Sequence, residues 1–226
     1  FRRAFGFTKE ILEIGYPRND ILFHKNNKED IEKIKKELGL PLDKKIILYA
    51  PTWRDNEFHG NGRYKFNPRI DFSLLMKQLK DDTVMIVKYH YLVMDQIDWS
   101  PYQGFIYTYD MSYDISLLYL VSDMLITDYS SVMFDYSILK RPILFYCYDL
   151  NEYKNTLRGF YFDLINEAPG PVVETMPTLL EAIKEYDFNL YKEKYKAFSK
   201  KYNHADDGNA SGKVIELLTK IVPYHN

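Results

Sequence analysis

The chain has 226 residues, of which 46% are hydrophobic and 27% are charged, and its net charge is −2 at pH 7. This size and composition fit one α/β domain with additional helices, and the near-balanced charge argues against a nucleic-acid binder, which usually carries a strong basic excess. The single cysteine, Cys147, excludes intrachain disulfides and multi-thiolate metal sites, and no apolar run reaches the length of a membrane span.

Five short apolar runs recur along the chain between helical patterns. They cover residues 46–49, 84–87, 105–107, 124–126 and 143–146. Each run is nearly continuous in hydrophobic residues rather than alternating, which is typical of strands that are covered on both faces. The sequence therefore predicts an α/β fold in which helices flank a parallel sheet.

Helical periodicity occupies the intervals between these runs. Apolar residues at 31, 34 and 38 predict a helix that Gly39 and Pro41 stop. Ser73 and Asp114 precede two further apolar patterns of helical spacing. The last third of the chain predicts helices near 179–186, 190–202 and 210–221.

The stretch 122–146 is the most informative part of the sequence. It predicts a buried strand, a turn that carries Asp128, Ser130 and Ser131, a helix over 132–139, and a second buried strand. The first amides of a helix have no internal partner and lie at the positive end of its dipole, so a serine-rich turn there favours an anion site. Either serine can cap the helix or donate to phosphate oxygens.

Asp135 lies one turn beyond Ser131 on the same face of this predicted helix. A carboxylate at that position can accept hydrogen bonds from a ribose while the helix start holds phosphates. The alternative is a capped helix with an ordinary aspartate.

Polar residues follow three of the predicted strands directly. Thr52 and Arg54 come after the first strand, Lys88 and His90 after the second, and the Asp128 turn after the fourth. In open parallel sheets, ligands bind at the carboxyl ends of the strands, so these segments predict one cleft. Lys88 and His90 suit a diphosphate, because lysine supplies a fixed charge and histidine can protonate a leaving phosphate. A histidine satisfied by backbone at a strand end is the alternative.

Other motifs are weaker or missing. GYPRND, residues 15–20, is a turn that presents Arg18, and DDGNAS, residues 206–211, opens the last helix; a connector and a helix cap are the alternatives. The sequence contains no G-x-G-x-x-G and no P-loop, which removes the main support for dinucleotide oxidoreductases and P-loop NTPases. The carboxylates do not form a recognisable metal site.

Together, GYPRND, YAPTWRD, KYHY, SDMLITDYSSVMFDYSILKRPILF, RGFYFD and the Asp-Gly of DDGNAS resemble the CDP-glycerol glycerophosphotransferases, which polymerise poly(glycerol phosphate) teichoic acids and related capsules. The resemblance covers almost the whole chain. It implies a GT-B fold, in which two Rossmann-like halves enclose the active site, and this chain resembles only the carboxyl-terminal, donor-binding half. We therefore expect residues 1–226 to form a single CDP-glycerol-binding domain and the amino-terminal acceptor domain to be absent.

The resemblance also implies a set of site residues. The donor pocket would be built from Arg18, Pro51, Thr52, Lys88, His90, Ser130, Ser131 and Asp135, with His90 catalytic. Second-tier candidates are Arg54, Asp128 and Arg158. The family often has arginine where this chain has Lys88, which keeps the charge but loses bidentate geometry. The family's other histidine, thought to act as the base, belongs to the amino-terminal half and has no counterpart here.

The function implied is transfer of glycerol phosphate from CDP-glycerol to the hydroxyl end of a growing chain, with release of CMP. CDP-glycerol and a lipid-carried poly(glycerol phosphate) acceptor would be the partners, without nucleic acid, cofactor or metal. The expected location is the cytoplasmic face of the bacterial membrane, with peripheral association through the missing half. The alternatives are a CDP-ribitol transferase, a nucleotide-sugar glycosyltransferase, or a non-catalytic nucleotide-binding module.

Overall fold

A computed structural model of the chain describes residues 2–52, 58–59, 63–64, 69–89, 97–152 and 162–221. Within these residues, parallel strands form a sheet in the order β5-β4-β1-β6-β7-β8. The strands are β1 (Lys45–Tyr49), β4 (Thr83–Val87), β5 (Ile106–Thr108), β6 (Met124–Thr127), β7 (Ile143–Tyr146) and β8 (Val172–Val173). A separate antiparallel pair joins β2 (Phe58–His59) to β3 (Arg63–Tyr64).

The predicted parallel sheet is confirmed, and all five predicted strands are present. The run expected at 105–107 forms a strand one residue later, and Phe105 packs in the core just before it. The sequence did not indicate β8, because a two-residue strand is too short to show a hydrophobic period.

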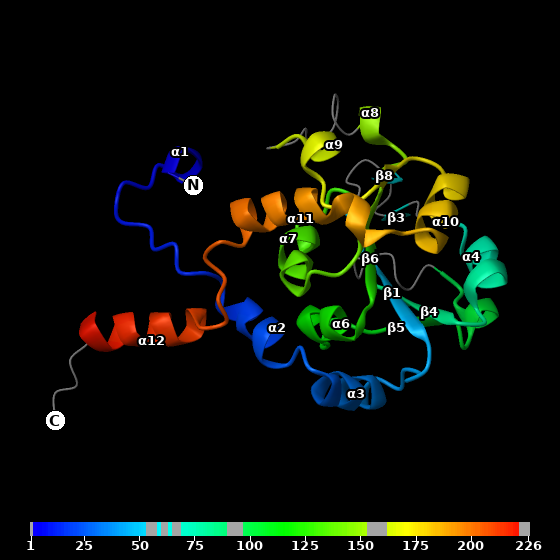
Figure 1. Cartoon of the computed structure of the whole chain (residues 1–226), viewed down its shortest axis with the longest axis horizontal. Coiled ribbons are helices and arrows are strands. Elements are labelled where there is room, and N and C mark those ends of the chain that lie inside the picture. The colour runs from blue at the N-terminus through cyan, green and yellow to red at the C-terminus, as the bar shows by residue number, and fades with distance from the viewer. Residues whose placement is uncertain are drawn as a thin grey trace.

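Helices cover both faces of the sheet (Figure 1). Successive strand residues point to opposite faces, so Ile46 and Leu48 join one buried cluster while Ile47 and Tyr49 join the other. The first cluster includes residues of α2 (Asp20–His24), α3 (Lys28–Glu37), α6 (Ile115–Val121), α7 (Val132–Tyr136) and α11 (Phe188–Tyr202). The second includes residues of α4 (Phe72–Leu79) and α10 (Met176–Lys184).

The helices begin and end largely where the sequence indicates. Asp114 caps α6 by accepting from the amide of Ser116 at 2.9 Å. The helix expected after Ser73 begins two residues earlier, because Asp71 is its N-cap and accepts from the amide of Leu74. Helix α3 ends before Gly39, whose φ of +68° lies in the left-handed region that glycine adopts more readily than other residues.

Two terminal segments lie at the left of Figure 1, away from the sheet: the amino-terminal segment with α1 (Arg2–Phe5), and α12 (Ala210–Ile221). The shorter elements are η1 (Pro17–Asn19), η2 (Ser100–Tyr102), η3 (Ser137–Leu139), α8 (Leu150–Glu152) and α9 (Leu164–Glu167). Within the described residues, no helix combines the length and the apolar character that a membrane span requires.

The strand order reverses at the middle of the sheet. From β1 the chain moves outward through β4 to β5, then returns to the other side of β1 and moves outward through β6, β7 and β8. In doubly wound folds, the crevice outside the carboxyl ends of the two strands at this reversal is where ligands bind. The fold therefore predicts a ligand site at the loops that follow β1 and β6.

Candidate functional site

The loops after β1 and β6 are joined by Asp128. The amide and the hydroxyl of Thr52 both donate to Asp128 Oδ1 at 2.7 Å, and the amide of Tyr129 donates to the same oxygen. Asp128 is 1% exposed. It thus fixes Pro51 and Thr52 at the reversal of strand order, and its hydrogen bonds join the two loops that follow β1 and β6.

Ser130 and Ser131 precede α7, as the sequence predicts. The helix runs over five residues and continues into η3, which together match the predicted 132–139. Ser131 is the N-cap, but the expected side-chain cap is absent because its φ of −62° and ψ of −10° are helical rather than extended. Among the described residues, neither serine hydroxyl has a hydrogen-bond partner, so both are available to a ligand.

Lys88 directly follows β4 at the same edge of the sheet. Its amide continues the ladder by donating to the carbonyl of Tyr49. Its ammonium donates to the carbonyls of Asp110 at 2.8 Å and Tyr109 at 3.3 Å. Burial lowers the pKa of Lys88, and the nearby Asp110 carboxylate opposes that effect only in part. The side chain is therefore a positive group that backbone carbonyls hold at the carboxyl end of β4.

Asp135 contacts Arg18 and Asn19 from the other end of the sequence. Arg18 Nη2 donates to Asp135 Oδ1 at 3.1 Å, Arg18 Nε donates to Oδ2 at 3.2 Å, and Asn19 Nδ2 donates to Oδ1 at 3.1 Å. The guanidinium also lies 4.2 Å from the ring centre of Tyr16. The hydrogen bond to Asp135 raises the pKa of Arg18.

The structure thus places in direct contact two residues, Arg18 and Asp135, that the sequence assigned to one donor pocket without pairing them. Sequence reasoning missed Asn19, which is 2% exposed. The available signal was the position of Asn19 next to Arg18 in GYPRND. The structure adds that its side-chain amide is buried, and a buried amide needs hydrogen-bond partners.

Three of the predicted site residues, His90, Arg54 and Arg158, lie outside the described residues. Among the residues that the structure does describe, no group of three or more His, Cys, Asp and Glu side chains gathers as a metal ion would require.

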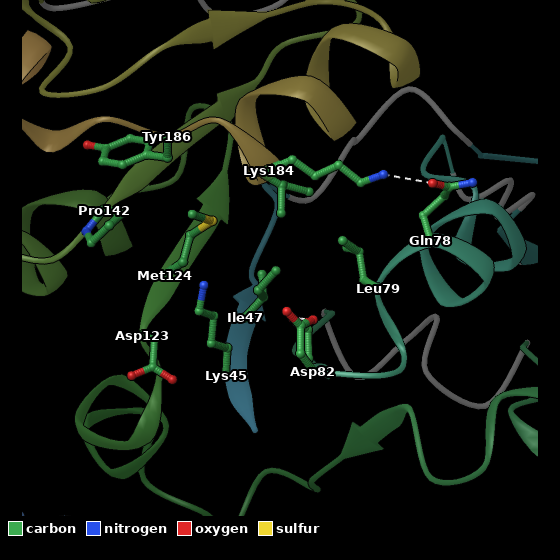
Figure 2. A pocket seen from close by; sticks show the side chains of 12 residues that line it. Lys45, Ile47, Gln78, Leu79, Asp82, Asp123, Met124, Pro142, Lys184 and Tyr186 are labelled. Atoms are coloured by element: carbon green, nitrogen blue, oxygen red, sulfur yellow. Dashed lines mark hydrogen bonds between the residues drawn. The ribbon is translucent and has the colours of Figure 1, made fainter. Parts of the chain in front are cut away.

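A cavity of about 430 Å³ lies at the opposite edge of the sheet (Figure 2). Lys45, Thr83 and Met124 line it, and these are the first residues of β1, β4 and β6. Lys184 Nζ donates to Gln78 Oε1 at 2.7 Å on its rim. Because this cavity is at the amino ends of the strands, it is separate from the loops at their carboxyl ends, which carry Thr52, Lys88 and Asp128.

A profile of the family described as CDP-Glycerol:Poly(glycerophosphate) glycerophosphotransferase matches residues 1–220. The chain is 47% identical over 222 residues to the teichoic acid poly(glycerol phosphate) polymerase of Bacillus subtilis (strain 168), covering 97% of this chain and 30% of that protein. It is 35% identical to the teichoic acid poly(ribitol-phosphate) polymerase of Bacillus spizizenii (strain ATCC 23059 / NRRL B-14472 / W23), covering 96% of this chain and 35% of that protein.

The solved structure of the wall teichoic acid polymerase TagF matches with a TM-score of 0.90 and 45% identity, over 97% of this chain and 55% of that one. A TagF variant soaked with CDPG matches with a TM-score of 0.87 and 43% identity, over 97% and 53% of the two chains. This likeness confirms the expected fold, a Rossmann-like α/β unit of the GT-B type.

Four curated relatives named for glycerol phosphate are 46–48% identical to the chain, and the chain spans 30–57% of their lengths. Four relatives named for ribitol phosphate are 31–35% identical. With the profile match over residues 1–220, these identities establish that the chain belongs to the CDP-glycerol:poly(glycerophosphate) glycerophosphotransferase family.

Proposed function

We propose that the chain is the donor-binding domain of a transferase that moves glycerol phosphate from CDP-glycerol to the hydroxyl end of a poly(glycerol phosphate) chain and releases CMP. The observation that carries this choice of donor is the higher identity to the relatives named for glycerol phosphate than to those named for ribitol phosphate. Transfer from CDP-ribitol is therefore the second candidate.

The diphosphate of the donor would lie between Lys88 and the start of α7. Lys88 supplies a positive charge there, and the hydroxyls of Ser130 and Ser131 are free to donate to phosphate oxygens. Arg18 has five N–H donors, of which two bond to Asp135, so its charge and remaining donors are available beside the phosphates.

The ribose would lie against Asp135. An ionised carboxylate offers about four acceptor positions, and Arg18 and Asn19 occupy three of them. The position that remains suits one ribose hydroxyl, and Pro51 and Thr52, which Asp128 holds in place, would line the adjacent nucleotide pocket.

In the proposed reaction, the acceptor hydroxyl attacks the phosphorus that carries glycerol, and the bond from that phosphorus to the oxygen of CMP breaks. The proton of the hydroxyl passes to a base outside the matched sequence, and His90 donates a proton to the leaving phosphate. Positioning of donor and acceptor and stabilisation of the phosphate charge supply most of the rate. We expect the 226-residue chain alone to bind the donor without turning it over, because it forms one wall of the cleft.

Binding is proposed to need no metal, because Lys88 supplies a positive charge at the place of the diphosphate and Arg18 keeps three N–H donors that Asp135 does not occupy. We further propose that the acceptor is carried on a lipid and that the protein works peripherally at the cytoplasmic face of the bacterial membrane. The relatives named for teichoic acid synthesis are enzymes of bacterial cell-envelope biosynthesis, which supports this placement.

Titration calorimetry of the 226-residue chain in excess EDTA tests the proposal. CDP-glycerol is expected to bind, and to bind more tightly than CDP-ribitol or a uridine-diphosphate sugar. Binding that requires added Mg²⁺ would contradict the metal-free site. Tighter binding of CDP-ribitol or of the uridine-diphosphate sugar would identify that ligand as the donor in place of CDP-glycerol. A longer form of the protein that binds CDP-glycerol but releases no CMP with a glycerol-phosphate primer would indicate a binding module.

A further inference from the structure

Two motifs at opposite ends of the sequence are hydrogen-bonded to each other. We call the segments 13–24 and 204–211 the terminal clasp. The amide of Tyr16 donates to Asp206 Oδ1 at 3.0 Å, although the two residues are 190 positions apart. His24 Nε2 lies 2.7 Å from the carbonyl oxygen of Gly208, which closes the other end of the clasp.

Asp20 joins the clasp to α12. Its Oδ1 accepts from the amide of Ala210 at 2.9 Å and its Oδ2 accepts from the amide of Ser211 at 2.8 Å. These amides open the helix and have no partner within it, so a carboxylate from a distant segment caps α12. Burial acts to raise the pKa of Asp20, but the hydrogen bonds from Ser211 and Ala210 outweigh it and lower the pKa below its ordinary value.

Two glycines allow the segments to approach this closely. A Cβ on Gly15 would lie 2.6 Å from the carbonyl oxygen of Ala205, and a Cβ on Gly208 would lie 2.8 Å from Cβ of Phe23. Both glycines have positive φ values, +88° and +83°, which other residues rarely adopt. The clasp is therefore built into the backbone as well as into the side chains.

The clasp holds the segment that carries Arg18. Element η1 (Pro17–Asn19) lies between Tyr16, which is bonded to Asp206, and Asp20, which is bonded to α12. Both sides of η1 are thus fixed by the carboxyl-terminal segment, while its side chains at Arg18 and Asn19 reach Asp135. The hydrogen bonds of Asp206 and Asp20 go to Tyr16 and to the start of α12, and those of Asp135 go to Arg18 and Asn19, so η1 is the element that connects the two sets.

We propose that Asp20 and Asp206 are positioning residues for the donor site, and that they orient Arg18 and Asn19 so that Asp135 presents its remaining acceptor position to the ribose. This inference rests on the proposed CDP-glycerol site. Because coupling between sites is reciprocal, donor binding must also stabilise the clasp.

The test compares Asp206→Ala and Asp20→Ala with Asp207→Ala in the 226-residue chain. Asp207 belongs to the same loop, but it accepts from Asn209 and Lys213 within the carboxyl-terminal segment, so it is a matched control. Calorimetry with CDP-glycerol is expected to give affinities about tenfold weaker for the two clasp variants, within the usual range of couplings between sites, and an unchanged affinity for the control.

A second comparison separates positioning from general destabilisation. In an Arg18→Ala background, Asp206→Ala is expected to cause a smaller loss of affinity than in the wild-type chain, because only the route through Asn19 to Asp135 remains. An equal loss in both backgrounds, or an unchanged affinity in the clasp variants of a folded protein, would overturn the inference and leave the proposed function standing. Failure of the wild-type chain to bind CDP-glycerol would overturn both.

Hydrogen exchange of the wild-type chain tests the same coupling without depending on how the variants fold. Saturating CDP-glycerol is expected to slow exchange at the amides of Tyr16, Ala210 and Ser211, which donate to the clasp carboxylates. Exchange rates at these amides that do not respond to the bound donor would show that the clasp and the site are independent.

Discussion

Arg18 and Asp135 form a two-pronged ion pair across 117 residues of sequence, with nitrogen–oxygen distances of 3.1 and 3.2 Å. The carboxylate comes from the helix after β6, and the guanidinium comes from the turn before α2. The pair links the part of the site that should hold ribose to the segment that the terminal clasp fixes. Asp135 therefore connects the packing of η1 to the proposed ribose site.

Replacing Asp135 should affect both stability and affinity. Asp135→Ala removes the acceptor of Asn19, which is 2% exposed, so we expect the free energy of unfolding to fall by about 1–3 kcal/mol, the cost of an unsatisfied buried donor. Affinity for CDP-glycerol should fall as well, as measured by calorimetry beside urea unfolding. Ser131→Ala is the control for stability, because Ser131 lies one turn earlier and is exposed. An unchanged unfolding curve for Asp135→Ala would show that water replaces the carboxylate as the acceptor of Asn19.

Thr52→Val should destabilise the crevice. The substitution preserves shape but removes the hydroxyl that donates to the Asp128 carboxylate at 2.7 Å. We expect a loss of about 1.5 kcal/mol in the free energy of unfolding, the lower end for a hydrogen bond to a charged group. Thr52→Ser keeps the hydroxyl and should lose less. Equal losses for the two variants in guanidinium unfolding would show that the hydroxyl contributes no more to stability than the methyl group that Thr52→Ser removes.

Lys88 should make donor binding sensitive to alkaline pH. Burial lowers its pKa below 10.5, and the donor phosphates favour its charged form, so affinity should be constant near neutral pH and fall as pH rises through the lowered pKa. Lys88→Arg stays charged and should bind with little pH dependence up to pH 10.5. Calorimetry across this range is the measurement, and parallel curves for the two proteins would exclude Lys88 as the titrating group.

The lowered pKa of Lys88 affects folding stability in the opposite direction from donor affinity. Between the lowered pKa of Lys88 and 10.5, the unfolded chain binds more protons than the folded one, so this residue's contribution to stability rises with pH in that window. A loss of affinity that coincides with a loss of stability would therefore have another origin.

His90→Ala in a catalytically competent, longer form of the protein should lower CMP release by about 10²–10⁴, the usual contribution of a positioned proton donor. The melting temperature should change little, because the apolar residues of β4 that precede position 90 are retained. The assay follows CMP with a glycerol-phosphate primer. Near-normal activity would identify His90 as a structural residue.

The sequence by itself determined the sheet and the edge of it at which the proposed site lies. Runs such as 84–87 and 143–146 are apolar throughout, short, and separated by helical patterns, which is typical of strands buried on both faces, so the parallel sheet was predictable. Once strands are parallel, their carboxyl ends share an edge. The placement of Thr52, Lys88 and Ser130 at one edge of the sheet therefore followed from their positions after strands. Local signals such as Asp114 before α6 were also sufficient to predict where a helix starts, because a capping side chain bonds within the first turn of its own helix.

Only the tertiary structure decided which polar groups meet. Asp128 and Thr52, Asp135 and Arg18, and Asp20 and α12 are separated by 76, 117 and 190 residues, and no spacing rule relates such positions. An aspartate after a strand has the same sequence signature whether it binds a ligand or holds a neighbouring loop. The choice depends on which donors the folded backbone places within about 3 Å of it, because a hydrogen bond requires that distance and a favourable angle.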